Sequence, residues 1–268
     1  MAQSEYIFHR VEDQRELERL RMIESVFDPA SRKRLLATGL QAGWRCLEVG
    51  PGAGSIMNWM GEVVGPTGGI LAVDLDPKFL GETERSNVNV SVVRADICTA
   101  QLPQQSFDVV HARYVLIHLS DYEVALTKMF DSLKPGGWLI LEEPDFSATR
   151  GITGDKQELV SFQKVNQAIE RMYAALKMDY ALGLKLPALM QRLGLQHLTV
   201  ENDTPLCSGG TGMATVMRLS AEQLQEKYLA TGVVGPSDLA RYRRFADDPN
   251  TWAIYYATIA VSGRKAQG

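Results

Sequence analysis

The segment CLEVGPGAGS, from Cys46 to Ser55, has the most specific residue spacing in the chain. Its apolar start runs into a turn with glycines at 50, 52 and 54, and such turns let the backbone approach a ligand closely. A dinucleotide fingerprint, G-x-G-x-x-G, would need its third glycine at position 55, where this chain has serine. The spacing therefore indicates either a ligand other than a dinucleotide or a tight connection that binds nothing.

Two acidic residues follow at the ends of later apolar stretches. Asp74 ends GGILAVD, 24 residues after Gly50, where an acid can accept hydrogen bonds from both hydroxyls of a ribose. Asp96 follows the next apolar stretch, in Arg94-Ala-Asp-Ile. If these stretches are adjacent parallel strands, the glycine turn and both acids meet at one edge of a sheet. The combination predicts a nucleoside-binding site.

The elements that would position these residues follow a regular order. Short apolar stretches alternate with helical patterns from Cys46 onward, which is typical of βαβ units and a parallel sheet. Glycine- and proline-containing turns precede the second and fifth apolar stretches. We expect strands at residues 45–49, 69–74, 89–94, 107–112, 137–142 and 195–200, and a final strand at 252–262.

Over about residues 40–145 the sequence resembles the class I S-adenosylmethionine-dependent methyltransferases. CLEVGPGAGS is similar to their first motif, AVDLD to their second, RADI to their third, and LKPGGWLILEEPD to their turn and fifth strand. The resemblance implies an α/β, doubly wound, Rossmann-like fold with a seven-stranded, mostly parallel sheet. Its last strand would insert antiparallel between the fifth and sixth. The implied cofactor is S-adenosyl-L-methionine, with S-adenosyl-L-homocysteine as its product.

The resemblance also implies which residues contact the cofactor. The glycine turn would receive the amino-acid end, with Glu48 near its ammonium group, Asp74 on the ribose and Asp96 on the adenine amino group. Glu48 could instead make a hydrogen bond within the turn, and Arg113 could meet the cofactor's carboxylate or form only a surface ion pair. The full implied set is Glu48, Gly50, Gly52, Ser55, Asp74, Leu75, Asp96, Ile97 and Arg113.

Helical patterns flank and interrupt this predicted core. We expect a helical cap at residues 1–40, the cofactor-binding core at 41–145 and a helical lid insertion at 146–182. Residues 183–268 would complete the core, with a second helical insertion at about 208–250. Insertions that follow strand ends in an α/β sheet stand where substrate pockets form.

Candidates for catalysis lie after the fourth and fifth predicted strands. Methyl transfer depends mainly on alignment of the reacting groups, and a base is needed only for a protonated acceptor. His118, Glu143 and Asp145 are the candidates for that base. His118 could instead pin the next helix, and the two acids could cap the following segment.

Composition limits the partners. A net charge of −4 disfavours nucleic acid, and we interpret Arg241, Arg243 and Arg244 as a solvated helix face. No apolar stretch reaches the ~20 residues of a membrane span, and the N-terminus lacks an apolar signal core. We therefore expect a cytoplasmic monomer or homodimer without a membrane span. The cysteines lack disulfide or zinc-ligand spacing, and we expect no metal.

The residues and the resemblance together predict methyl transfer to a small organic acceptor, as in bacterial natural-product and quinone pathways. We place O-methylation first and leave N- and C-methylation open. One rival is a cyclase or rearrangement enzyme that keeps the cofactor as an electrostatic element. The other is a non-catalytic binding protein that retains the fold.

Overall fold

The computed structural model describes residues 7–8, 13–80 and 89–267, and its chain divides into two compact units. The sheet unit comprises Phe27–Glu143, Gly183–Glu201 and Ile259–Gly268. The helical unit comprises Met1–Val26, Pro144–Leu182 and Asn202–Thr258.

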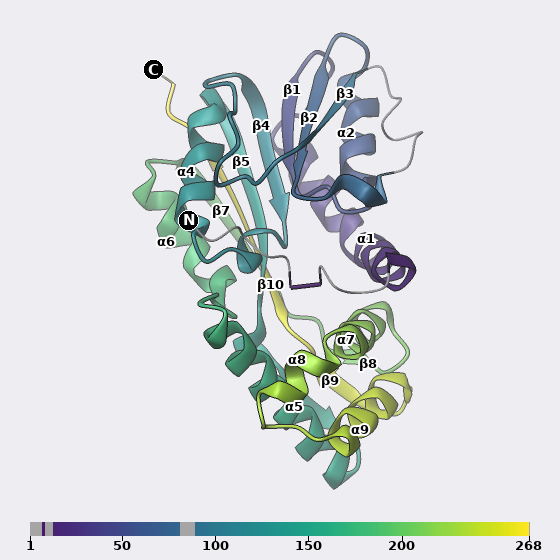
Figure 1. The fold of residues 1–268 in the computed structure, drawn as a ribbon. Coiled ribbons are helices and arrows are strands. Elements are labelled where there is room, and N and C mark those ends of the chain that lie inside the picture. Colours follow the sequence, from purple (N-terminus) through teal and green to yellow (C-terminus); the bar gives the residue numbers. More distant parts are fainter. Residues whose placement is uncertain (1–6, 9–12, 81–88, 268) are drawn as a thin grey trace. The chain divides into compact units, whose positions relative to one another are not determined.

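A seven-stranded sheet forms the core of the sheet unit, in the order β3-β2-β1-β4-β5-β10-β7 (Figure 1). The pairs β1·β2, β1·β4, β2·β3 and β4·β5 are all parallel. β1 and β2 have the predicted bounds, whereas β5 begins before the predicted Gly137. The strands are β1 (Arg45–Val49), β2 (Gly69–Asp74), β3 (Val90–Arg94), β4 (Phe107–Arg113), β5 (Leu133–Asp145), β7 (Gln196–Asp203) and β10 (Ala257–Arg264).

The last strand, β10, lies between β5 and β7, as the resemblance implied. Its direction follows from contacts at both ends of β5. Near the start of β5, Gly137 O accepts a 2.8 Å hydrogen bond from the N–H of Lys265, which follows β10. Toward the end of β5, a Cβ on Gly183 would meet both Glu143 O at 2.7 Å and Ile259 Cβ at 3.1 Å. The two strands are therefore antiparallel.

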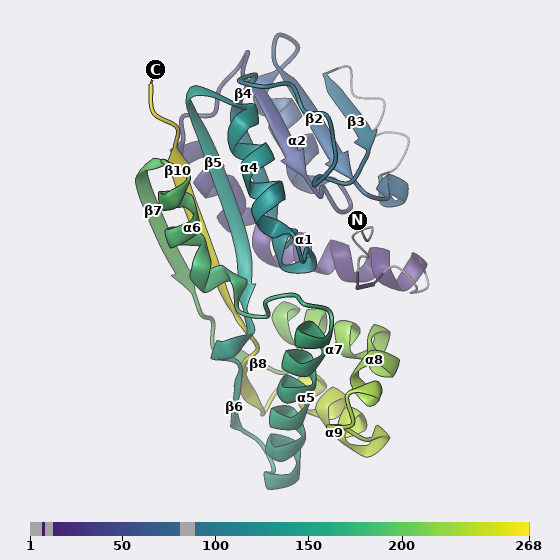
Figure 2. The same cartoon turned by 60° about the vertical axis from the view of Figure 1, so that its left-hand side comes forward.

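Helices cover both faces of this sheet. On one face, α2 (Ser55–Val64) buries Ile56, Met57, Met60 and Val64 in a cluster that also contains Leu35 of α1 (Asp13–Ala37). This spacing places the apolar side chains on one side of α2, as expected for a helix packed on a sheet. Figure 2 shows α4 (Tyr122–Ser132) and α6 (Leu186–Arg192) on the other face. The short helices η1 (Pro77–Phe79), η2 (Leu116–His118) and η4 (Leu182–Lys185) lie in the connections.

The helical unit contains a small antiparallel sheet that the sequence did not predict. Its order is β6-β9-β8, with β6 (Arg150–Thr153), β9 (Trp252–Ile254) and β8 (Cys207–Ser208). The predicted strand at 252–262 is therefore wrong as a single element, because β9 and β10 divide it. Around this sheet lie η3 (Phe146–Ala148), α5 (Lys156–Ala175), α7 (Gly212–Gln223), α8 (Gln225–Ala230) and α9 (Pro236–Asp247).

Aromatic rings fill the interior of the helical unit. The ring of Phe162 lies 5.0 Å from that of Phe245, 5.3 Å from that of Tyr242 and 5.5 Å from that of Tyr255, between centroids. All four side chains are buried. Rings of this size bury large apolar areas, so α5, α9 and the β9–β10 junction share one core.

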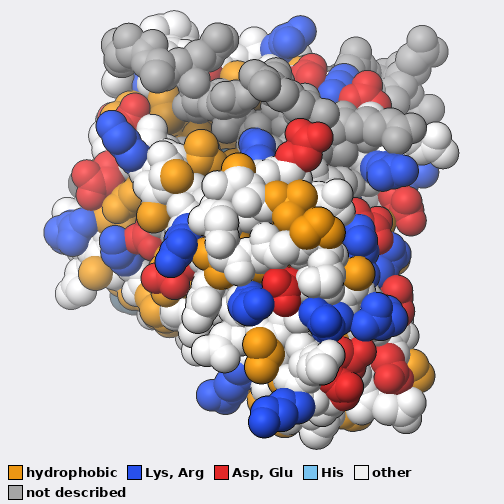
Figure 3. Space-filling view, turned by 60° about the horizontal axis from the view of Figure 1, so that its bottom comes forward, with side chains coloured by type: hydrophobic (Ala, Val, Ile, Leu, Met, Phe, Trp, Pro, Cys, Tyr) orange, Lys and Arg blue, Asp and Glu red, His pale blue; other side chains and the backbone are white. Residues whose placement is uncertain are grey.

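Charged side chains of the helical unit pair with one another. Arg241 Nη1 lies 3.7 Å from Asp238 Oδ1, and Arg244 Nε lies 4.0 Å from Glu158 Oε1. On the face shown in Figure 3, Lys and Arg side chains lie among Asp and Glu side chains rather than in one basic surface. Ion pairs with a partly exposed arginine contribute little stability.

Candidate functional site

The parallel registers align the carboxyl ends of four strands. Val49 pairs with Val73 of β2 and with Ala112 of β4, and Asp74 pairs with Arg94 of β3. The glycine turn begins directly after Val49, and the N–H of Gly50 donates to Val73 O at 2.9 Å. The turn, Asp74 and the segment leading to Asp96 therefore leave the sheet at one edge, where ligands of α/β sheets bind.

The glycine turn requires its glycines for conformational and steric reasons. Gly50, Gly52 and Gly54 have φ values of 66°, 62° and 99°, in the region that residues with a Cβ rarely adopt. A Cβ on Gly50 would also lie 2.5 Å from Val115 Cγ2. The turn is thus packed closely against the segment that follows β4, with Gly54 at the N-terminus of α2.

Backbone N–H groups hold the two acids at their strand ends. Asp74 Oδ1 accepts from the N–H of Asp76 at 2.8 Å, and Asp96 Oδ1 accepts from the N–H of Cys98 at 2.8 Å. Burial raises the pKa of Asp74. Each carboxylate is therefore fixed by the turn that follows it. Leu75 and Ile97, also in the predicted set, directly follow Asp74 and Asp96; Leu75 is half-buried and Ile97 is buried.

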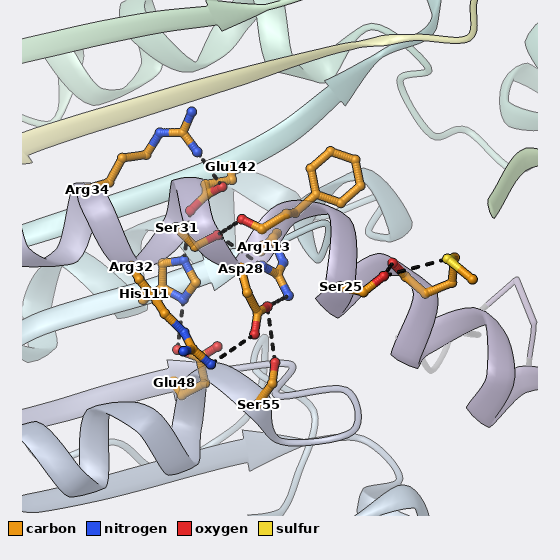
Figure 4. Close-up of polar contacts among 12 residues, drawn as sticks. Ser25, Asp28, Ser31, Arg32, Arg34, Glu48, Ser55, His111, Arg113 and Glu142 are labelled. Atoms are coloured by element: carbon orange, nitrogen blue, oxygen red, sulfur yellow. Dashed lines mark hydrogen bonds and ion pairs between the residues drawn. The ribbon is translucent and has the colours of Figure 1, made fainter. Parts of the chain in front are cut away.

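Ser55 and Arg113 both bind helix α1, and the sequence did not predict these contacts. Ser55 Oγ donates to Asp28 Oδ1 at 3.1 Å, and Arg113 Nη2 donates to the same oxygen at 3.0 Å. Arg113 Nη1 also donates to Ser31 Oγ at 2.9 Å. Figure 4 shows Asp28 of α1 between the start of α2 and the end of β4. Asp28 and Ser31, one helical turn apart on α1, were therefore missed as parts of this edge.

A second group of buried polar side chains lies across β1, β4 and β5 (Figure 4). His111 Nδ1 is 2.8 Å from Glu48 Oε2, and His111 Nε2 is 3.2 Å from Glu142 Oε1. Arg34 of α1 donates from Nη1 to Glu142 Oε2 at 2.9 Å and also pairs with Glu201. Glu48 therefore makes a hydrogen bond to the neighbouring strand β4 rather than within the turn, and its contact with a ligand stays a prediction. The sequence assigned no role to His111 or Arg34.

Glu143 and Asp145, two of the three catalytic candidates, both bind backbone N–H groups. The buried Glu143 carboxylate accepts from the N–H groups of Val115, Leu116 and Ile117 at 2.7 to 3.2 Å. Burial raises the pKa of Glu143 to about 8, against the lowering effect of these three donors. Asp145 Oδ1 accepts from the N–H and the hydroxyl of Ser147 and caps η3.

The third candidate, His118, is half-buried at the end of η2, the segment that Glu143 binds. Glu143 therefore fixes the backbone that carries His118. A role for any of the three as a base stays a prediction.

Within residues 7–8, 13–80 and 89–267, no three His, Cys, Asp or Glu side chains gather in a group that could hold a metal ion. No helix within these ranges has the length and apolar character needed to cross a membrane.

Residues 47–141 match the family model described as "Methyltransferase domain". Aklanonic acid methyltransferase from a Streptomyces species (strain C5) is 32% identical over 127 residues, which are 46% of this chain and 58% of that protein. Demethylmenaquinone methyltransferase from Staphylococcus aureus is 34% identical over 116 residues, 42% of this chain and 48% of that protein. The chain thus spans only about half the length of these curated relatives.

A solved structure extends the likeness to the fold. Phosphoethanolamine N-methyltransferase 2 from Haemonchus contortus, in complex with S-adenosyl-L-methionine, aligns with a TM-score of 0.54 at 20% identity. The alignment covers 85% of this chain and 50% of that one. At this identity the likeness concerns the fold alone. Residues 47–141 thus match a methyltransferase domain, and the strand order of the sheet unit is the one that the resemblance to class I methyltransferases implied.

Proposed function

We propose that this chain transfers a methyl group from S-adenosyl-L-methionine to a small organic acceptor and releases S-adenosyl-L-homocysteine. The observation that carries the proposal is the shared edge of the sheet, where the glycine turn, Asp74 and Asp96 follow three adjacent parallel strands. A scaffold protein would have no need for this combination. The methyltransferase domain match over residues 47–141 supports the same conclusion.

The residues at this edge suit the parts of that cofactor. The left-handed turn of Gly50 and Gly52 exposes backbone without side chains to the amino-acid end, and Glu48 lies two residues before the turn. Asp74 would accept the ribose hydroxyls and Asp96 the adenine amino group. When bound, the cofactor supplies an electrophilic methyl group on a sulfonium. The chain's own work is then to orient the acceptor and exclude water.

The curated relatives support a small acceptor. One is named for aklanonic acid and the other for demethylmenaquinone, both small molecules. We infer an O-methyl product first, with N- and C-methylation as the remaining choices. The net charge of −4 favours such an acceptor over nucleic acid, and we propose a cytoplasmic enzyme. We also propose that residues 146–182 form a lid and that His118 acts as a base.

Product stoichiometry tests the proposal. The purified chain is incubated with S-adenosyl-L-methionine and a panel of phenols, amines and stabilised carbanions, and S-adenosyl-L-homocysteine is quantified against product. Equal amounts of the two support transfer. Product without S-adenosyl-L-homocysteine would support the cyclase, and no calorimetric binding at millimolar cofactor would support the binding protein.

His118→Gln tests the proposed base in the same assay. The variant should lower turnover more than cofactor affinity, because glutamine cannot accept and release the acceptor's proton. Equal losses in turnover and affinity would assign His118 a structural role.

A further inference from the structure

Four side chains of alternating charge form a continuous row beneath the glycine turn. They are Glu48 of β1, His111 of β4, Glu142 of β5 and Arg34 of α1, and all four are buried. Glu48 and His111 are direct partners in the β1·β4 register, so their side chains lie on the same face of the sheet. The row therefore connects the strand that enters the glycine turn with helix α1.

The partners of His111 define its charge. A neutral imidazole has one N–H group, yet both ring nitrogens of His111 lie within hydrogen-bond distance of a glutamate oxygen. Only the imidazolium can donate to both carboxylates. Although burial lowers the pKa of His111, the charges and hydrogen bonds of Glu48 and Glu142 outweigh it and raise the pKa to about 9.

The charged groups around His111 come from each neighbouring element. Glu48 faces it from β1 and Glu142 from β5. The cations next in line are Arg34 of α1, which binds Glu142, and Arg113 of β4, whose charge also acts on Glu142. Glu142 is thus shared with two arginines, whereas the hydrogen bond from His111 is the charge-assisted contact that the structure gives Glu48.

We propose that His111, held as an imidazolium between Glu48 and Glu142, is a positioning residue that keeps the Glu48 carboxylate oriented toward the ammonium group of the cofactor's amino-acid end. This inference rests on the proposed function. A neutral residue in place of His111 would leave the Glu48 carboxylate buried without its counter-charge and without the hydrogen bond that fixes its orientation. A carboxylate that is no longer held in this orientation binds an ammonium group less well.

Two ligands separate this role from a merely structural one. S-adenosyl-L-homocysteine carries the amino-acid end, whereas 5′-methylthioadenosine has the same nucleoside and a thioether without it. Calorimetry with His111→Gln should show about tenfold or greater loss of affinity for the first ligand, the loss of one charge-assisted interaction. Affinity for the second should stay within about twofold. The exposed His197→Gln is the matched control and should change neither affinity.

The other outcomes are decisive as well. Equal loss for both ligands would show that His111 only supports the fold, and no loss for either would show that Glu48 needs no partner. Glu48→Gln should give the same selective loss, and adding His111→Gln to it should lower the affinity no further. A wild-type chain that binds neither ligand would refute the proposed function, and this inference with it.

A measurement on the wild-type chain tests the same inference if the His111 variant fails to fold. Nitrogen-15 NMR of histidine-labelled protein at pH 7 should show both ring nitrogens of His111 protonated. S-adenosyl-L-homocysteine should shift these signals, and 5′-methylthioadenosine should leave them in place. A neutral imidazole, or equal shifts with both ligands, would overturn the proposal.

Discussion

Replacing Asp28 by asparagine should destabilise the sheet unit by about 3 kcal/mol. The Asp28 carboxylate accepts from Arg113 at 3.0 Å and from Ser55 at 3.1 Å, and its side chain and that of Arg113 are only 11% and 10% exposed. Asparagine keeps one acceptor oxygen but removes the negative charge. The buried Arg113 guanidinium then loses the carboxylate that it binds. Breaking a buried ion pair by removing one partner costs about 3–5 kcal/mol of folding stability. Because asparagine retains an acceptor oxygen, we expect a cost at the lower end of this range.

Urea unfolding followed by tryptophan fluorescence measures this cost. Three of the four tryptophans, Trp44, Trp59 and Trp138, lie in the sheet unit, so a Trp252→Phe background makes the signal specific to that unit. Asp28→Asn is compared in this background with its parent. The shift in midpoint at an unchanged slope gives the change in free energy of unfolding.

Two further variants decide whether the buried pair is the cause. Arg32 also pairs with Asp28, at 3.4 Å, but is 42% exposed, so Arg32→Met should cost less than about 1 kcal/mol. Combining Asp28→Asn with Arg113→Met removes both buried charges and should cost at least about 1 kcal/mol less than the sum of the single changes. A cost below about 0.5 kcal/mol for Asp28→Asn, or strict additivity in the double variant, would refute the reasoning.

Three other outcomes are expected. Asp74→Ala should weaken S-adenosyl-L-homocysteine binding at least tenfold in calorimetry, because each charge-assisted ribose hydrogen bond contributes about 1.5–3 kcal/mol; unchanged affinity would exclude the ribose assignment. Gly50→Ala should lower the melting temperature more than Gly65→Ala, since both have positive φ but only the new Cβ at position 50 would meet a neighbour, Val115 Cγ2 at 2.5 Å; equal losses would contradict that clash. The pKa of Glu143 is about 8 in the folded chain, against 4.5 for an ordinary glutamate. The neutral side chain therefore stabilises the fold below pH 4.5, and this stabilisation, at most about 5 kcal/mol, is lost as the pH rises through 8. Glu143→Gln should flatten this part of the pH profile in urea unfolding, and an unchanged profile would place the titration elsewhere.

Local patterns were sufficient to predict the central strands and their shared edge. Buried parallel strands are short, continuous apolar stretches, and glycines bound those of β1 and β2, so their limits could be read directly. The glycine turn, Asp74 and Asp96 each follow such a stretch. The parallel pairing that unites them then follows from the alternation of strands and helices.

The sequence did not reveal contacts between distant residues. His111 is 63 residues from Glu48 and 31 from Glu142, and no periodicity links such positions. Asp28 looked like one charge among many on an amphipathic helix. The small sheet escaped prediction for a different reason: its strands are two to four residues long, and β-forming residues continue through Tyr255 and Tyr256, where β9 and β10 separate.

Helix α1 determines where an independently stable fragment can begin. A shortened chain that begins after Ala37 would keep all of residues 47–141, the part that matches the methyltransferase domain. It would nevertheless lose Asp28, Ser31 and Arg34, and with them the partners that α1 gives to Arg113 and Glu142. Buried charges without partners are among the costliest defects in a folded protein. We therefore expect the smallest autonomous folding unit of this chain to extend beyond residues 47–141 and to include the part of α1 that carries Asp28, Ser31 and Arg34.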